Sequence, residues 1–156
     1  MKNTINIIII CTLFSLNTQA QVKKYNWKRA IVPASLSFVS GTTNGLNQTI
    51  SHHYSSFKTV FPKANDRYWN PEYSWMNKYK GGDQHAGPKY FGSTTFLAWT
   101  TDAYHLTNTV SRATLFSAGV SIGIGEKRPW WHYAIDVGVS FVSYSAGFHL
   151  VYSGVF

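Results

Sequence analysis

Apolar residues in this chain fall into long segments, separated by shorter segments rich in charged and turn-forming residues. Residues 30–50 are apolar but rich in Ser, Thr and Gly, a composition that lets membrane helices approach each other closely. Residues 51–62 continue this segment as an amphipathic stretch. The pattern predicts an all-α protein, a small membrane-associated bundle of about three to four apolar helices.

The second half of the chain carries the other predicted helices. Ser93 is suited to be the N-cap of a helix over 94–106 and beyond. Residues 113–125 form a further apolar stretch that contains Gly119-x-x-x-Gly123. Pro129 prevents helix continuation through the charged turn before it. The final run, 137–156, approaches the length needed to cross a bilayer, and its one potentially charged side chain is a histidine.

Residues 63–92 differ from the apolar segments on both sides. Asn-Pro, Gly-Gly and Gly-Pro pairs punctuate them, as is typical of turns. A disordered linker would not carry so many aromatic side chains. We therefore expect an ordered aromatic loop whose rings pack on the body of the protein or lie in the interfacial layer. The aromatic residues are Tyr68, Trp69, Tyr73, Trp75, Tyr79, Tyr90 and Phe91.

A β-sheet interpretation competes with the helical one. Apolar residues alternate with small or polar residues over 118–124 and 135–141. The chain ends Phe148-x-Leu150-x-Tyr152-x-Gly154-x-Phe156, which resembles the last strand of a bacterial outer-membrane barrel. A small outer-membrane β-barrel is therefore the alternative fold, with 55–95 as one very long loop.

The first 20 residues have the pattern of a secretory signal peptide. Lys2 provides the positive end, residues 5–16 the apolar run, and Thr18-Gln19-Ala20 the small residues before a cleavage site. We expect residues 1–20 to be removed and 21–156 to form a single domain, so that the mature protein begins at Gln21. The protein is then exported to a membrane of the cell envelope, inner or outer.

Composition supports contact with lipid. The chain has 14 Lys and Arg against 6 Asp and Glu, and 17% of its residues are aromatic. Charged residues make up 13%, whereas ordinary soluble domains have about 25%. A basic, aromatic, charge-poor envelope protein suggests anionic lipid headgroups as partners. Export and the lack of a recognisable motif argue against nucleic acid as a partner.

The candidate chemistry lies in a few polar residues at or near the apolar segments. Asp102 and His105 are spaced i, i+3, which places them on one helical face, and Arg112 falls near that face. Glu126 and Asp136 lie at the boundaries of the following apolar segments. One interpretation is a structural polar network that ties the helices together. The other is a catalytic site, with His105 as base, Asp102 orienting it, Glu126 and Asp136 as further carboxylates or metal ligands, and Arg112 contacting an anion.

Other histidines give weaker signals. His52 and His53 are adjacent, so on a helix they diverge and do not readily bind one ion. His132 follows Trp130 and Trp131 and is expected in an aromatic belt at the membrane surface. The residues alone identify no metal and no cofactor.

Three runs carry a resemblance to known proteins. They read FPKANDRYWNPEYSWMNKYKGGD, FGSTTFLAWTTDAYHL and YSAGFHLVYSGVF. Together they resemble a group of small uncharacterised proteins of bacterial envelopes and phages, which implies a helical, membrane-associated fold and no established activity. The polar pattern Asp102-x-x-His105, Glu126 and Asp136 is distantly similar to that of VanZ-like membrane proteins, which implies an arrangement of helices only.

The sequence therefore leads to three functional hypotheses. The first is a small exported envelope protein with a structural or accessory, lipid-contacting role and no catalysis. The second is a membrane enzyme that acts on a lipid or phosphate headgroup through Asp102 and His105. The third is a small outer-membrane barrel.

Overall fold

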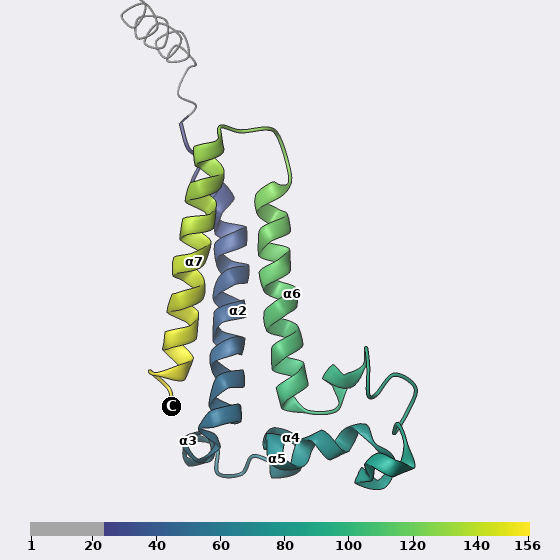
Figure 1. Ribbon diagram of the computed structural model, residues 1–156. Helices are drawn as coiled ribbons and strands as arrows, with labels where there is room; N and C mark the ends of the chain where they lie inside the picture. The colour runs from purple at the N-terminus through teal and green to yellow at the C-terminus, as the bar shows by residue number, and fades with distance from the viewer. Residues whose placement is uncertain (1–23) are drawn as a thin grey trace, which may run out of the picture.

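Three long helices lie side by side in the computed structural model, which describes residues 24–156 (Figure 1). They are α2 (Lys28–His52), α6 (Ala103–Gly123) and α7 (Trp130–Tyr152). The central helix, α2, packs against both others, whereas α6 and α7 scarcely contact each other. The predicted all-α class is confirmed. The predicted signal peptide lies outside the described residues.

The β-barrel alternative is wrong, because residues 24–156 contain no strand and only one isolated bridge, between Tyr79 and Pro88. The alternating pattern near the C-terminus belongs to helix α7 instead. Its small residues Ser140 and Gly147 are buried, while Val137 and Phe141 are exposed. Alternation over a few residues is thus compatible with a helix that has one small buried face.

Glycines bring α2 and α7 into backbone contact. A Cβ atom on Gly45 would lie 2.8 Å from the carbonyl oxygen of Phe148, and one on Gly41 would overlap the carbonyl of Tyr144. From the other side, a Cβ on Gly147 would overlap the carbonyl of Phe38. Gly41-x-x-x-Gly45 is therefore the small-residue motif that packs these two helices.

Hydroxyl and amide groups join α2 to α6. Ser40 Oγ donates to the carbonyl oxygen of Ser111 at 2.7 Å, and Ser111 Oγ donates back to the carbonyl of Ser40 at 3.0 Å. Asn47 Nδ2 donates to the carbonyl of Tyr104 and to Thr107 Oγ1, at 2.9 and 2.8 Å. These buried groups satisfy one another across the interface, so polar residues hold the helices together.

The predicted helix start at Ser93 is wrong. Residues 93–101 form turns and the short 3₁₀ helix η4 (Ala98–Thr100), and α6 begins at Ala103. Ser93 is fully buried, and its Oγ donates to the carbonyl of Lys78 instead of capping a helix. Asp102 is the N-cap. The two apolar stretches predicted over 94–125 contribute to this single helix.

The other long helices differ modestly from their predicted bounds. Helix α2 covers the predicted 30–50, and a break at His53 separates it from α3 (Tyr54–Val60). Helix α7 begins at Trp130, directly after Pro129, earlier than the predicted 137. Of the helices in residues 24–156, α7 alone is long and apolar enough to cross a membrane by length and hydropathy, whereas the sequence predicted about three to four apolar, membrane-associated helices. Inward-facing Ser, Thr and Asn side chains lower the hydropathy of α2.

The predicted aromatic loop is built of short helical turns and forms an arm, residues 63–101, that projects sideways from one end of the bundle (Figure 1). Its α-helical turns are α4 (Asp66–Trp69) and α5 (Pro71–Ser74), capped by the side chains of Asn65 and Asn70. Three 3₁₀ turns follow, η1 (Trp75–Lys78), η2 (Lys80–Gly82) and η3 (Gln84–Ala86). Rings from the arm, including Tyr68 and Trp69, pack on a small core of Ile50, Phe57 and Ala103 at its base.

Candidate functional site

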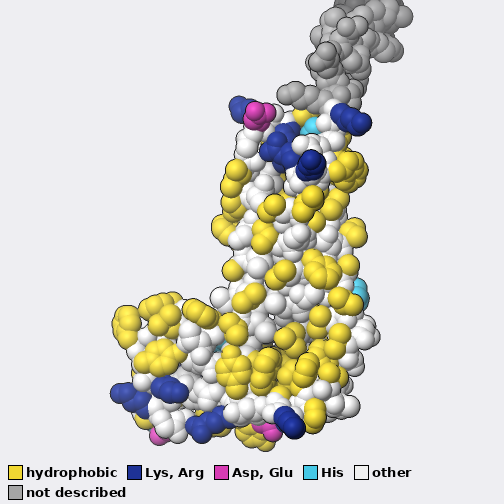
Figure 2. All heavy atoms as spheres, turned by 180° about the vertical axis from the view of Figure 1, so that it is seen from behind, with side chains coloured by type: hydrophobic (Ala, Val, Ile, Leu, Met, Phe, Trp, Pro, Cys, Tyr) yellow, Lys and Arg dark blue, Asp and Glu magenta, His cyan; other side chains and the backbone are white. Residues whose placement is uncertain are grey.

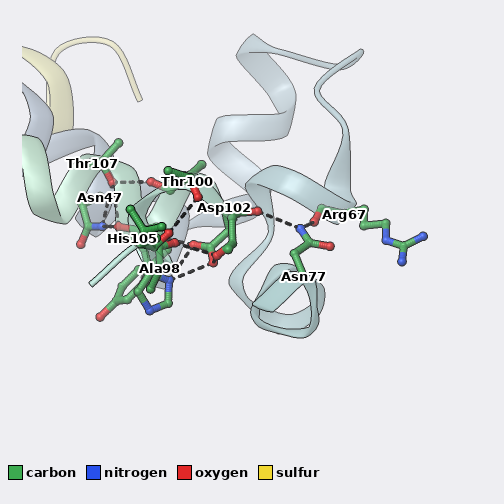
Figure 3. A network of polar contacts seen from close by, with 12 residues as sticks. Asn47, Arg67, Asn77, Ala98, Thr100, Asp102, His105 and Thr107 are labelled. Atoms are coloured by element: carbon green, nitrogen blue, oxygen red, sulfur yellow. Dashed lines mark hydrogen bonds and ion pairs between the residues drawn. The ribbon is translucent and has the colours of Figure 1, made fainter. Parts of the chain in front are cut away.

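Asp102 and His105 are in direct contact where the arm joins α6 (Figure 3). The backbone N–H of His105 donates to Asp102 Oδ1 at 2.8 Å, as in an N-cap. Ring atom Nδ1 of His105 lies 2.8 Å from Oδ1 and 2.9 Å from Oδ2. Thr101 Oγ1 donates to Oδ2 at 2.9 Å. The expected contact between these two residues is therefore confirmed, and Asp102 is fully buried within it.

These hydrogen bonds determine the charge of Asp102. Burial alone opposes ionisation, but hydrogen bonds from the side chain and backbone of His105 and from Thr101, with the charge of the imidazole, outweigh it. The net result is a pKa of Asp102 below its ordinary value. Asp102 is therefore an ionised helix cap at neutral pH, which is a stabilising role in its own right.

Two side-chain amides connect the residues around this cap to other parts of the chain (Figure 3). Asn47 joins the first turn of α6 to α2, and Asn77 joins Thr101 to the arm. Asn77 Nδ2 donates to the carbonyl oxygens of Arg67 and Thr101, at 2.7 and 3.2 Å.

A polar cleft of about 310 Å³ opens beside Asn77 and Thr101. Its cations are Arg67 and Lys89, and no carboxylate lines it in the described chain. The cleft can therefore accept an anionic group.

Asp136 lies at the opposite end of the bundle in a second polar centre. Arg128 Nη1 approaches Asp136 Oδ2 at 2.5 Å, and Nη2 donates to the carbonyl of Ile122 at 2.6 Å. Tyr25 Oη donates to Asp136 Oδ1. The guanidinium of Arg128 also lies 4.3 Å from the ring centroid of Tyr133. This centre ties the α6–α7 turn and the start of the described chain to α7.

The pKa values of Tyr25 and Arg128 reflect their contacts with Asp136. Burial, together with the hydrogen bond to Asp136 and its negative charge, raises the pKa of Tyr25 to about 12. Burial opposes the charge of Arg128, but its interactions with the side chains of Asp136 and Tyr133 outweigh this effect and raise the pKa of the guanidinium. Both groups therefore keep their protons at every physiological pH.

The five candidate residues do not form one site. Asp102 and His105 lie at one end of α6, and Glu126 and Asp136 lie near its other end, about 30 Å away for a helix of this length. Glu126 is exposed and lines a small cleft together with Lys24, Arg29 and Lys127. Arg112 is exposed midway along α6 and makes no ion pair with any residue in 24–156.

The histidines outside this pair have separate roles. His52 ends α2, and His53 Nε2 lies 2.9 Å from Tyr152 Oη. His132 is buried between the rings of Tyr25 and Trp131, rather than at the surface as an aromatic belt requires. Within the described chain no group of three or more potential ligands could hold a metal ion.

Sequence reasoning missed Tyr25 and Arg128, the two partners of Asp136. Arg128 lies in the charged turn before Pro129, and the sequence alone assigns it no partner. Its position eight residues before a carboxylate in an apolar helix was the available signal. Tyr25 is 111 residues away from Asp136 and gave no local signal.

Replacement of Asp102 by asparagine is expected to lower stability by about 1–3 kcal/mol, because a buried charge-assisted cap is left incomplete. The folded pKa of Asp102 is below its unfolded value of about 3.9. The ionised group therefore contributes stability above that unfolded value, and this contribution is lost as the pH falls through the folded pKa. Unfolding curves in detergent should show a difference between wild type and Asp102→Asn at pH 7 that shrinks below about pH 4. An equal difference at both pH values would contradict this role.

Comparisons of the chain with protein-family models, curated proteins and solved structures found no match.

Proposed function

We propose that the protein is a small exported envelope protein whose three long helices span the membrane, with a structural or accessory, lipid-contacting role. The observation that carries this proposal is the distribution of side chains across α2, α6 and α7. Their outer faces are apolar, and their inner faces consist of small and polar residues. This is the reverse of a soluble bundle, which buries large apolar residues.

The outer faces expose large apolar side chains along the whole bundle (Figure 2). Phe116 is 74% exposed and Phe141 is 70% exposed. Soluble monomers rarely expose contiguous apolar surface of this extent, and such surface marks contact with a membrane or a partner. Further exposed apolar residues on these helices are Ile31, Val32, Leu115, Val120, Val137, Val142 and Leu150.

The inner faces show what packs a bundle when hydrocarbon surrounds it. Buried positions of α2 include Ser37, Ser40 and Asn47, besides its glycines. Those of α6 include Thr107 and Ser111. Lipid hydrocarbon is as apolar as a protein interior, so burying an apolar side chain between membrane helices gains no hydrophobic free energy. Close backbone approach and interhelical hydrogen bonds hold such helices together instead.

Charge marks the two ends of the apolar bundle. Residues 30–52 of α2 contain no Asp, Glu, Lys or Arg, and α7 contains only Asp136. Lys and Arg gather at both ends of the bundle, in the arm and at the turn between α6 and α7 (Figure 2). Helix α7, with 23 residues, is about 34 Å long, close to the hydrocarbon thickness of about 30 Å.

These cationic ends support anionic headgroups as the lipid partners. The cleft beside Arg67 and Lys89 is lined by polar groups without a carboxylate, which suits a phosphate. The cleft at the other end is lined by Lys24, Arg29 and Lys127 together with Glu126, so its cations outnumber its one carboxylate. Basic groups close to an anionic membrane surface each contribute about 1 kcal/mol to binding.

Replacement of Phe141 by aspartate tests the proposal. In lipid, a carboxylate at the middle of a helix costs about 2.5–3.5 kcal/mol, so this variant should be lost from the carbonate-resistant membrane fraction. The matched control is Phe91→Asp in the arm, where the phenylalanine is 87% exposed but lies outside the three helices. It should remain in the membrane fraction. Equal recovery of Phe141→Asp and wild type in that fraction would argue against a spanning bundle.

One observation favours a second function, catalysis on a lipid or phosphate headgroup. His105 is 29% exposed at its side chain, with Nδ1 held by Asp102 and no hydrogen bond to Nε2 from the described residues. A histidine oriented in this way can act as a general base. Release of headgroup from phosphatidylglycerol vesicles by wild type, and its loss in His105→Gln but not in His149→Gln, would favour this function.

A further inference from the structure

The arm consists of two segments of opposite character. Every Asp, Glu, Lys and Arg of the arm lies in its charged segment, residues 63–89. Its apolar segment, residues 90–101, contains none of these and no histidine. The apolar segment nevertheless exposes large side chains, since Phe91 is 87% exposed and Phe96 is 63% exposed. The rings of Phe91 and Phe96 contact each other, with centroids 5.7 Å apart, so they form one exposed apolar patch.

The two segments lie on opposite sides of the arm. In Figure 1 the residues that lead into α6, with η4, lie on the side from which the three long helices rise, and α4 and α5 lie on the far side. Figure 2 shows the same division by side-chain type. Hydrophobic side chains line the edge of the arm that faces the middle of the bundle, and Lys and Arg side chains lie along the opposite edge. The arm is therefore amphipathic across its thickness.

The orientation of the bundle determines what each side of the arm meets. The arm projects sideways from one end of the bundle, so it lies parallel to the membrane surface when the three helices cross the bilayer. Its apolar side then faces the hydrocarbon, and its charged side faces headgroups and water. The outer faces of the helices and the apolar segment of the arm, which are distant in sequence, thus turn toward the same apolar layer.

Hydrogen bonds within the apolar segment satisfy polar groups that acyl chains could not satisfy. Thr100 Oγ1 donates to the carbonyl oxygen of Leu97 at 2.8 Å, and Thr101 Oγ1 donates to that of Ala98 at 2.7 Å. The backbone N–H of Leu97 donates to the carbonyl of Gly92 at 2.9 Å. These bonds lower the cost of removing the segment from water, so it can lie against lipid.

The polar cleft of the arm lies at the boundary between the two segments. The charged segment contributes Arg67, Asn77 and Lys89 to its lining, and the apolar segment contributes Tyr90 and Thr100. When the apolar segment faces the hydrocarbon, this boundary lies at the level of the lipid headgroups. The cations of the cleft are then at the depth where phosphate groups are found.

We propose that the arm docks on one leaflet of the bilayer beside the bundle, with Phe91 and Phe96 among the upper acyl chains and the charged segment among the headgroups. Amphipathic interfacial elements bury their apolar face about 5–10 Å into this boundary. The inference rests on the proposed function, because the spanning bundle sets the level of the arm. It deepens that function by giving the lipid contact a defined surface and depth. Since the three helices hold the protein in the bilayer, Phe91→Asp should weaken the docking and yet remain in the membrane fraction.

Depth-dependent quenching of a fluorescent dye tests the docking. Phe91→Cys, Lys80→Cys and Val142→Cys, each in a Cys11→Ser background, carry a nitrobenzoxadiazole dye in phosphatidylcholine–phosphatidylglycerol vesicles. A nitroxide is placed in both leaflets on the headgroup, near the top of the acyl chain or near its end, so the result does not depend on the orientation of the protein. We expect strongest quenching by the upper acyl nitroxide at position 91, by the headgroup nitroxide at position 80, and by the chain-end nitroxide at position 142.

A matched pair of variants shows whether the apolar patch causes the insertion. Phe96→Asp should raise the dye at position 91 to the headgroup level, so that the headgroup nitroxide becomes its strongest quencher. Tyr73→Asp, in the charged segment, removes an aromatic ring that is 51% exposed and should leave the depth of position 91 unchanged. The dye at position 142 should keep its depth in both variants, which shows that the bundle is intact. An unchanged depth of position 91 in Phe96→Asp would overturn the proposal.

The remaining outcomes separate the docking from the proposed function. Strongest quenching of position 91 by the headgroup nitroxide, with position 142 still quenched at the chain end, contradicts the docking alone. Protection of position 91 from every nitroxide also contradicts it, and loss of that protection on dilution with lipid would show that a second copy covers the patch. If the chain-end nitroxide does not quench position 142, the bundle does not span the bilayer, and the proposed function itself is contradicted.

Discussion

Replacement of Gly41 by leucine is expected to separate α2 from α7 and to lower stability by about 3 kcal/mol or more. The added side chain would overlap the carbonyl group of Tyr144 and approach the backbone N–H of Phe148. Backbone atoms of a helix cannot move aside as a flexible side chain can, so the whole interface must open. Unfolding in detergent, followed by circular dichroism, should show the loss.

Gly138→Leu is the matched control for this prediction. It adds the same side chain to a helix, but there is no other atom within 4 Å of the position of its Cβ. Its stability should equal that of wild type or exceed it by up to about 1 kcal/mol, because leucine favours a helix more than glycine does. If Gly41→Leu and Gly138→Leu unfold alike, the close contact of α2 with α7 is not what holds the bundle together.

Replacement of Arg128 by leucine is expected to cost about 3–5 kcal/mol, because Asp136 is then left buried without its cation. Tyr25 still donates a hydrogen bond to the carboxylate, but no positive charge offsets its burial. The neighbouring Lys127 is exposed, so Lys127→Leu provides the control and should change stability little. Thermal unfolding in detergent measures both variants.

A double variant separates the ion pair from other effects of losing Arg128. Arg128→Leu with Asp136→Leu removes both charges, and it should be more stable than Arg128→Leu alone. The hydrogen bond from Arg128 to the carbonyl of Ile122 is lost in both variants, so it cancels in the comparison. A double variant less stable than the single one would show that the unpaired carboxylate is not the source of the loss.

The sequence predicted the helical class and the approximate positions of α2 and α7, because long apolar runs and Pro129 determine them locally. It misplaced the start of α6. Ser93 and Asp102 are both good N-cap residues, and only the tertiary contact of Ser93 with the carbonyl of Lys78 decides between them. Capping preferences depend only on neighbouring residues, so they cannot predict a hydrogen bond to another part of the chain.

The packing motif shows a similar limit. Gly119-x-x-x-Gly123 and Gly41-x-x-x-Gly45 have the same spacing, yet only the second pair contacts another helix in residues 24–156. Which pair faces a neighbour depends on the rotation of each helix in the bundle. The sequence alone therefore could identify both motifs but could not assign their partners.

The candidate site was predictable only where its residues are close together in the sequence. Asp102 and His105 are one turn apart, so helical geometry alone brings them together. Asp136 meets Arg128 and Tyr25 through the turn between two helices and the folding back of the described N-terminus. Those contacts depend on the tertiary arrangement, which separates the two polar centres to opposite ends of the bundle.

The central claim is that the three helices cross a membrane, and labelling of single cysteines in sealed vesicles tests it most directly. Gln84→Cys lies in the arm, Lys127→Cys in the opposite turn, and Val142→Cys on the exposed apolar face of α7. A membrane-impermeant maleimide should label only one of the first two until detergent opens the vesicles, and it should not label Cys at 142 while the vesicles are intact. Equal labelling of all three positions in intact vesicles would contradict the claim.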